Sequence, residues 1–192
     1  VIGLLYIMAF QFDVVMLSLL RGEEAVGWYG VAQTVFTAFL LVPQAYRAVL
    51  YPRMSRLHNR GKNSTGLREL YSTSLYHMLS LGLPLASGLT LIAPDIVSLF
   101  FNQPSLPATR ALRWIAWALL MQYLNVPNVR MMLAGGLQSQ SAWFLAASVG
   151  IGLLGNAILI PRLGVSGAAL VRMIISLIFF SLSAVAVHRQ IC

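Results

Sequence analysis

Six long stretches of apolar residues fill most of the chain, and the charged residues fall almost entirely in the gaps between them. A helix needs about 18–20 apolar residues to cross roughly 30 Å of hydrocarbon, and each stretch is about that long. The pattern therefore predicts six transmembrane helices. Their expected limits are about residues 1–20, 28–51, 70–93, 112–133, 143–160 and 165–187.

The composition agrees with this pattern. Hydrophobic residues make up 58% of the chain and charged residues 9%, whereas soluble domains average roughly 45–50% and 25%. The alternative is one very apolar soluble helical domain, but its helices would have polar faces, which most of these stretches lack. We therefore expect an all-α integral membrane protein, with residues 1–192 forming a single bundle of six transmembrane helices.

Glycine and proline mark the boundaries and the irregular points of these helices. The clearest breaks are Gly135-Gly136, the segment 161–164 and the segment 61–66. Pro43, Pro84 and Pro127 fall inside predicted helices, where neighbouring helices can satisfy the carbonyls that proline leaves free. They predict kinks, which serve either packing or helix bending during transport.

The chain begins at Val1 within an apolar stretch, without an initiator methionine or a charged leader. We interpret it as a piece of a longer protein, with an N-terminal part upstream.

Lysine and arginine near the ends of the spans predict the orientation. Eight of them fall at the end that holds the loop 53–68, the connection after the fourth span and the C-terminus, against four at the opposite end. The 53–68 loop and both ends of the segment are therefore expected in the cytoplasm, at a plasma (inner) membrane. The net charge of +8 then reflects topology and anionic membrane lipids rather than nucleic-acid binding.

No catalytic motif is recognisable. Cys192 is the only cysteine, and the three histidines share no metal-ligand spacing. We find no glycine-rich phosphate loop, nucleophile elbow or paired-carboxylate site, so we expect neither an enzyme nor a bound metal or cofactor.

Asp13 is the first charge that falls inside a span, where an ionised group costs at least about 2.5–3.5 kcal/mol. It lies eight residues before Arg21, about 12 Å along a helix from the outer end. It is either an ion-coupling or cavity carboxylate, or the structural partner of an arginine in a missing helix.

Arg172 is the second such charge, about seven residues into the sixth span. A guanidinium that faces a cavity could bind an anionic head group, because its fork of donors suits phosphate. The alternative is that the side chain reaches the outer interface.

A stripe of polar residues marks the fourth span. Gln122, Asn125 and Asn128 recur at helical spacing, so we expect this face to meet protein or water and to line a substrate cavity. Arg47, near the cytoplasmic end of the second span, either binds substrate or reaches the interface. Gln33 and Asn156 add polar groups, and together these residues predict a polar, net cationic interior.

Small residues mark the fifth span. Gly150, Gly152 and Gly155, with Ala146 and Ala147, form a face suited to close helix contact.

The order of several short motifs resembles a known family. The first is Asp13 followed by the apolar run 14–17, and the second is the Gly27-Trp28-Tyr29 step. Pro52 before a basic loop follows, and then the stretch 159–169, Leu-Ile-Pro-Arg-Leu-Gly-Val-Ser-Gly-Ala-Ala. Over nearly the whole chain, this order is similar to the second half of bacterial O-antigen and exopolysaccharide flippases of the multidrug/oligosaccharidyl-lipid/polysaccharide exporter superfamily.

The resemblance implies two six-helix bundles, of which this chain is the C-terminal one. It implies transport of undecaprenyl-pyrophosphate-linked oligosaccharides to the outer leaflet by alternating access through a cationic cavity. The expected partners are this anionic glycolipid, membrane lipids, the missing N-terminal bundle, and polysaccharide polymerase and other pathway proteins. The family often has a basic residue just before the aspartate, where this chain has Phe12, so Arg172 and Arg47 are the better candidates for head-group binding.

Three alternatives stay open. A multidrug antiporter of the same superfamily would use Asp13 to couple proton or sodium entry, but two deep arginines suit a cationic drug poorly. A lipid II flippase shares the bundle plan. A membrane-embedded polysaccharide polymerase or ligase would need a larger outer loop than segments 21–27, 102–109 and 161–164 provide.

Overall fold

A computed structural model describes residues 2–59, 65–101 and 105–191, and within these residues every regular element is a helix. The all-α prediction is therefore confirmed. The helices are α1 (Ile2–Arg21), α2 (Glu23–Phe39), α3 (Leu41–Asn59), α4 (Thr65–Phe101), α5 (Leu106–Ala134), α6 (Gln138–Leu163) and α7 (Val165–Ile191).

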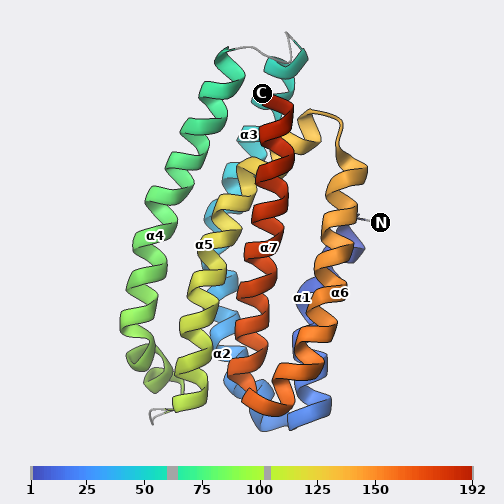
Figure 1. The fold of residues 1–192 in the computed structure, drawn as a ribbon. Coiled ribbons are helices and arrows are strands. Elements are labelled where there is room, and N and C mark those ends of the chain that lie inside the picture. The colour runs from blue at the N-terminus through green and yellow to red at the C-terminus, as the bar shows by residue number, and fades with distance from the viewer. Residues whose placement is uncertain (1, 60–64, 102–104, 192) are drawn as a thin grey trace.

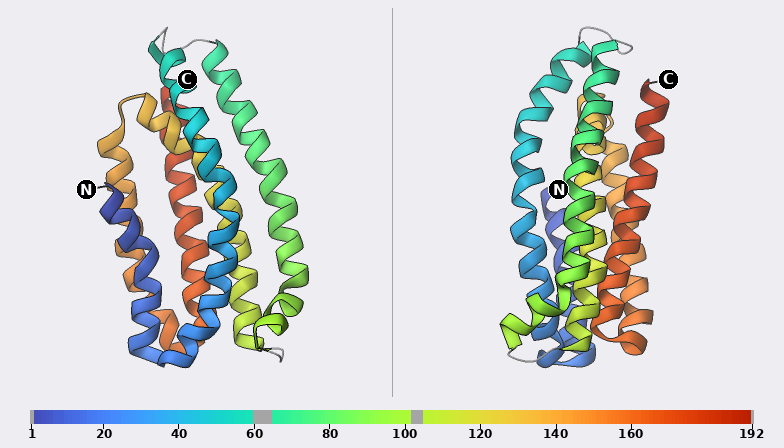
Figure 2. Two further views of the ribbon diagram at one scale, coloured as in Figure 1. Left: turned by 180° about the vertical axis from the view of Figure 1, so that it is seen from behind. Right: turned by 90° about the vertical axis from the view of Figure 1, so that its left-hand side faces the viewer.

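The second predicted span contains two helices rather than one. It begins at Glu23, earlier than expected, and is divided at Leu40. Pro43 contributes to the division, because it has no backbone N–H to continue the hydrogen bonding of α2. It lies in the first turn of α3, where that N–H is not needed. Because α2 and α3 follow one another across the bundle (Figure 2), the seven helices make six passes.

Within the described residues, four of these passes are long and apolar enough to cross a membrane by length and composition alone. They are α2 with α3 over residues 23–58, α4, α6, and α7 over residues 165–189. Two of the three predicted breaks are confirmed: Gly136 and Gly164 have φ of 77° and 59° between successive helices, a conformation that favours glycine. The third, 61–66, lies largely outside the described residues.

Helix α5 lies at the centre of the bundle, which explains its polar stripe. It packs against α7, α4, α2 and α3, while α1 packs mainly against α6 and α2. Figures 1 and 2 show α5 with α7 on one side and the α2–α3 pass on the other. Most of its residues from Ala108 to Asn128 are buried. Of the polar stripe, Asn125 and Asn128 are buried against protein, and Gln122 is half-buried.

The helix connections gather at two ends, as the charge pattern predicted. The ends of α3, α4 and α7 that carry the basic residues lie together with the α5–α6 connection, and the α1–α2 and α6–α7 turns lie at the opposite end (Figure 1). Which end faces the cytoplasm stays a prediction.

Two glycines of the predicted small-residue face allow α6 to approach α7 closely. A Cβ atom on Gly152 would lie 2.7 Å from Ile175 Cδ1, and one on Gly155 would lie 3.1 Å from Val171 Cγ1. The close contact is confirmed at these two positions. Gly150 does not share it, because a Cβ atom there would meet nothing within 4 Å.

Candidate functional site

The two charges predicted inside the spans are partners of one another. Arg172 Nε of α7 lies 2.8 Å from Asp13 Oδ2 of α1, and each residue is only 3% exposed. The arginine that Asp13 needs as a structural partner is therefore present in this chain. Because the two charges cancel, this part of the interior is neutral rather than cationic.

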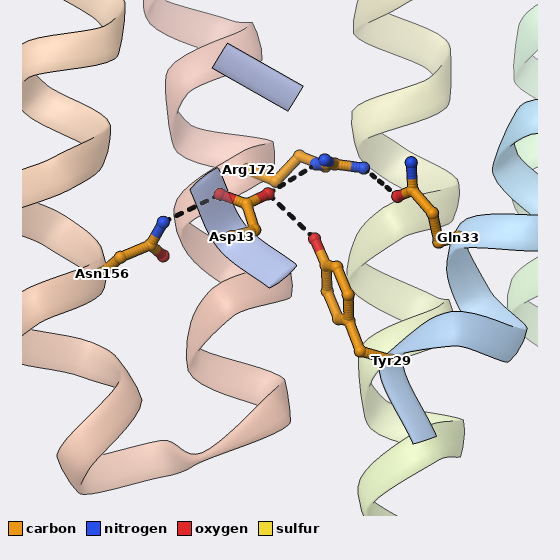
Figure 3. A network of polar contacts seen from close by, with 5 residues as sticks. All are labelled: Asp13, Tyr29, Gln33, Asn156 and Arg172. Carbon is orange, nitrogen blue, oxygen red and sulfur yellow. Dashed lines mark hydrogen bonds and ion pairs between the residues drawn. The ribbon is translucent and has the colours of Figure 1, made fainter. Parts of the chain in front are cut away.

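The carboxylate of Asp13 joins four helices. Tyr29 of α2 donates its hydroxyl hydrogen to Asp13 Oδ2 at 3.0 Å, and Asn156 of α6 donates from Nδ2 to Oδ1 at 2.8 Å. Arg172 also donates from Nη1 to Oε1 of Gln33 on α2. Figure 3 shows Asp13 between Asn156 on one side and Arg172 with Tyr29 on the other. Three donors thus occupy the acceptor sites of one carboxylate and tie α1 to three other helices.

Aromatic rings complete the environment of the guanidinium. The Cζ atom of Arg172 lies 5.7 Å from the ring centroid of Tyr29 and 5.3 Å from that of Phe36. Both rings are buried. Their electron-rich faces favour a cation in a site that excludes water, so they add to the stabilisation that Asp13 provides.

A small cavity of about 20 Å³ adjoins the ion pair, which is enough for a single water molecule. Its lining includes Asp13, Asn156 and Gly152. Within the described part of the chain, Oδ1 of Asn156 has no hydrogen-bond donor although it is buried. A water molecule in this cavity is the simplest way to satisfy it.

The polar stripe of α5 forms a second network, nearer the basic end. Asn128 donates from Nδ2 to Ser183 Oγ at 3.0 Å and accepts from the Tyr71 hydroxyl at 2.7 Å. Asn125 donates from Nδ2 to the Ser176 carbonyl at 3.4 Å. Both asparagines are buried. In this conformation they hold α5 against α7 and α4, and their role in a substrate cavity stays a prediction.

The structure does not bring the remaining candidates to the ion pair. Gln122 and Arg47 are half-buried, on α5 and α3. Arg130 of α5 has its guanidinium carbon Cζ 6.0 Å from the ring centroid of Tyr51 on α3. Substrate binding by Arg47 and Gln122 stays a prediction.

Sequence reasoning missed the role of Tyr29. The predicted span begins at residue 28, but α2 begins at Glu23, so Tyr29 lies within the helix and its side chain is 0% exposed. The signal was available: Tyr29, Gln33 and Phe36 are spaced by four and three residues, so they share one face of a helix. That face is directed at Arg172.

Replacing Tyr29 with phenylalanine tests how much this network stabilises the bundle. The change removes one donor to a charged acceptor and keeps the ring, so we expect a loss of about 1.5–3 kcal/mol. Thermal unfolding in detergent measures it, with Tyr76→Phe as the control because Tyr76 is 70% exposed. Equal midpoints for the two variants would contradict the hydrogen bond.

The fold and the buried network define a multi-pass helical membrane protein in which a buried ion pair joins α1 to α7. Residues 1–158 match the family model described as MatE, and the chain belongs to this family. This family is part of the multidrug/oligosaccharidyl-lipid/polysaccharide exporter superfamily, so the superfamily prediction is confirmed.

The chain is also similar to one curated protein. The chain is 24% identical over 157 residues to the probable low-salt glycan biosynthesis flippase Agl15 of Haloferax volcanii. The match covers 82% of this chain and 33% of that protein, so the chain spans about a third of the length of the relative. No solved structure matches the chain significantly.

Proposed function

We propose that this chain forms one six-helix bundle of a flippase that moves lipid-linked oligosaccharides from the cytoplasmic to the outer leaflet by alternating access. The single observation that carries the proposal is the similarity to a probable glycan biosynthesis flippase over 82% of the chain. The MatE match agrees with it at the level of the superfamily. The second bundle belongs to the rest of the longer protein and is part of the proposal.

The substrate is an undecaprenyl-pyrophosphate-linked repeat unit of a surface polysaccharide, such as O-antigen or exopolysaccharide. Arg172 and Arg47 are the cations proposed to meet its pyrophosphate, because guanidinium binds phosphate in a bidentate manner. Arg172 is 3% exposed and paired with Asp13. The head group therefore reaches it only in another conformation, in which the helices around the pair have moved apart.

The same pairing argues against the main alternative, a cation-coupled multidrug antiporter. Asp13 already receives a guanidinium, a hydroxyl and an amide. A cationic drug or a sodium ion would have to displace Arg172 or sit beside its positive charge, and both cost free energy in a water-poor site. Lipid II also carries an anionic pyrophosphate, so the ion pair does not argue against the lipid II flippase alternative.

The orientation proposed is the one that the basic residues predict. The α3–α4 connection and both ends of the segment face the cytoplasm, where the excess of arginine and lysine is expected. For a bacterial protein, the membrane is the inner membrane.

Transport by the complete protein in liposomes tests the substrate class. We expect a fluorescent undecaprenyl-pyrophosphate oligosaccharide to become accessible to an added lectin faster in proteoliposomes than in empty liposomes. Lipid II and a cationic dye are compared in parallel. Faster movement of lipid II would favour the second flippase, and dye movement without glycolipid movement would overturn the proposal in favour of the antiporter.

A further inference from the structure

Proline leaves a backbone carbonyl free at the junction between α2 and α3. In a continuous helix the carbonyl of Phe39 would accept from the N–H of residue 43, but residue 43 is proline and has no N–H. The chain divides one residue beyond Phe39, at Leu40. Pro43 itself is buried. A carbonyl without a donor is costly inside a membrane protein, because no water in the hydrocarbon can satisfy it.

The central helix provides the missing donor. Tyr123 of α5 donates its hydroxyl hydrogen to the Phe39 carbonyl at 2.9 Å. The ring of Tyr123 is 0% exposed, and it packs beside Gly82 of α4, where a Cβ atom would lie 3.3 Å from the Tyr123 Cβ. The hydroxyl is therefore held in place by the packing of α5 against α4. The position of the Tyr123 hydroxyl at the junction is therefore fixed by the packing of its ring.

A second proline-freed carbonyl, near the C-terminal end of α4, also accepts a hydrogen bond from α5. Pro94 removes the usual N–H partner of the Thr90 carbonyl, and Arg113 of α5 donates to that carbonyl from Nε at 3.3 Å. Figure 2 shows the last turns of α4 leaving the line of the rest of the helix. Two proline-freed carbonyls in two neighbouring passes thus receive their donors from α5.

We infer that residues 39–43 form a hinge between α2 and α3, and that the Tyr123 hydroxyl is the latch that holds the hinge in the present conformation. The chain there lacks a hydrogen bond that a regular helix would have, so bending costs less than elsewhere in the pass. Bending moves the Phe39 carbonyl away from α5 and breaks the latch. The hinge does not depend on what is transported and is separate from the proposed function.

The hinge also connects to the buried network. Phe36, one turn before the junction, lies under the guanidinium of Arg172, and Gln33 accepts from it. Movement of α3 relative to α2 therefore leaves this network intact, whereas movement of α2 breaks it. Release of the latch therefore lets α3 move at the basic end of the pass, while α2 stays bonded to α7 through Gln33 and Arg172.

The experiment compares Tyr123→Phe with and without Pro43→Ala. Phenylalanine keeps the ring and removes the latch, while alanine at position 43 restores an N–H for the Phe39 carbonyl. Nitroxide labels on cysteines at Thr34 and Val49, one on each side of the hinge, report the distance distribution after Cys192→Ser. Both positions are exposed. Tyr46→Phe is the matched control, because that hydroxyl donates to Ser74 Oγ rather than to a proline-freed carbonyl.

We expect Tyr123→Phe to broaden the distance distribution and lower the unfolding midpoint by about 2–4 °C. Adding Pro43→Ala should restore the narrow distribution and remove at least half of the shift. Tyr46→Phe should leave the distribution unchanged. An unchanged distribution in Tyr123→Phe, or equal effects of that substitution with proline and with alanine at position 43, would overturn the inference. The midpoint comparison decides the case if the labelled Tyr123→Phe protein is too unstable for distance measurement.

Discussion

Replacing Asp13 with leucine is expected to destabilise the protein by about 3–5 kcal/mol, the largest effect of any single substitution considered. The change leaves the Arg172 guanidinium buried at 3% exposure without its counter-charge. It also removes the acceptor for Tyr29 and Asn156. Breaking a buried ion pair from one side costs this much because an uncompensated charge stays in a site with little water.

The double variant Asp13→Leu/Arg172→Met separates the charge from the packing. Removing both charges should recover most of the lost stability, since an apolar pair of similar volume often replaces a buried ion pair without loss. Thermal unfolding in detergent measures Asp13→Leu, Arg172→Met and the double variant, with Asp95→Leu as the control because Asp95 is exposed near the end of α4. Additive losses in the double variant would show that the two residues do not act as a pair.

Transport by the double variant then tests the proposed role of Arg172. A protein that unfolds normally but moves the glycolipid at least tenfold more slowly would assign a role in transport to the pair. Normal transport at normal stability would contradict head-group binding by Arg172. The two measurements keep the contribution to the fold apart from the contribution to function.

The sequence predicted the passes of this fold well because their physical cause is local. A stretch of apolar residues of sufficient length must form a helix in a membrane, whatever its neighbours are. The breaks at Gly136 and Gly164 are local for the same reason, since their positive φ favours glycine. The division at Leu40 was harder to predict, because a proline inside a span indicates an irregular helix but not whether the helix bends or ends.

The sequence predicted the charged residues of the site but not their pairing. Asp13 and Arg172 stand out in the sequence because each is costly inside a membrane. Their pairing is not visible there, because it joins residues that are 159 positions apart. Which helix lies next to α1 is decided by the packing of α6 and α7, and sequence periodicity carries no information on that choice. From the sequence alone, Asp13 and Arg172 look like two separate sites, and only the fold shows that they form one.

Gly167→Ala is expected to destabilise the protein by about 2–3 kcal/mol. A Cβ atom at this position would lie 2.4 Å from the Leu159 carbonyl oxygen and 2.8 Å from its carbon. Overpacking a buried contact costs about 1–3 kcal/mol. The upper part of that range applies here because the atoms in the way are backbone atoms of α6, which cannot rotate aside as a side chain can. Helices α6 and α7 must separate near their turn.

The same separation should weaken the ion pair. Asn156 lies three residues before Leu159 on α6, and Arg172 lies five residues after Gly167 on α7, so the close contact sets the spacing of both around Asp13. Gly150→Ala is the matched control on α6, because a Cβ atom there meets nothing within 4 Å. Asp13→Leu should then cost less in the Gly167→Ala protein than in the Gly150→Ala protein, measured by thermal unfolding. Equal costs would show that the contact at Gly167 shapes the turn alone and does not position the network.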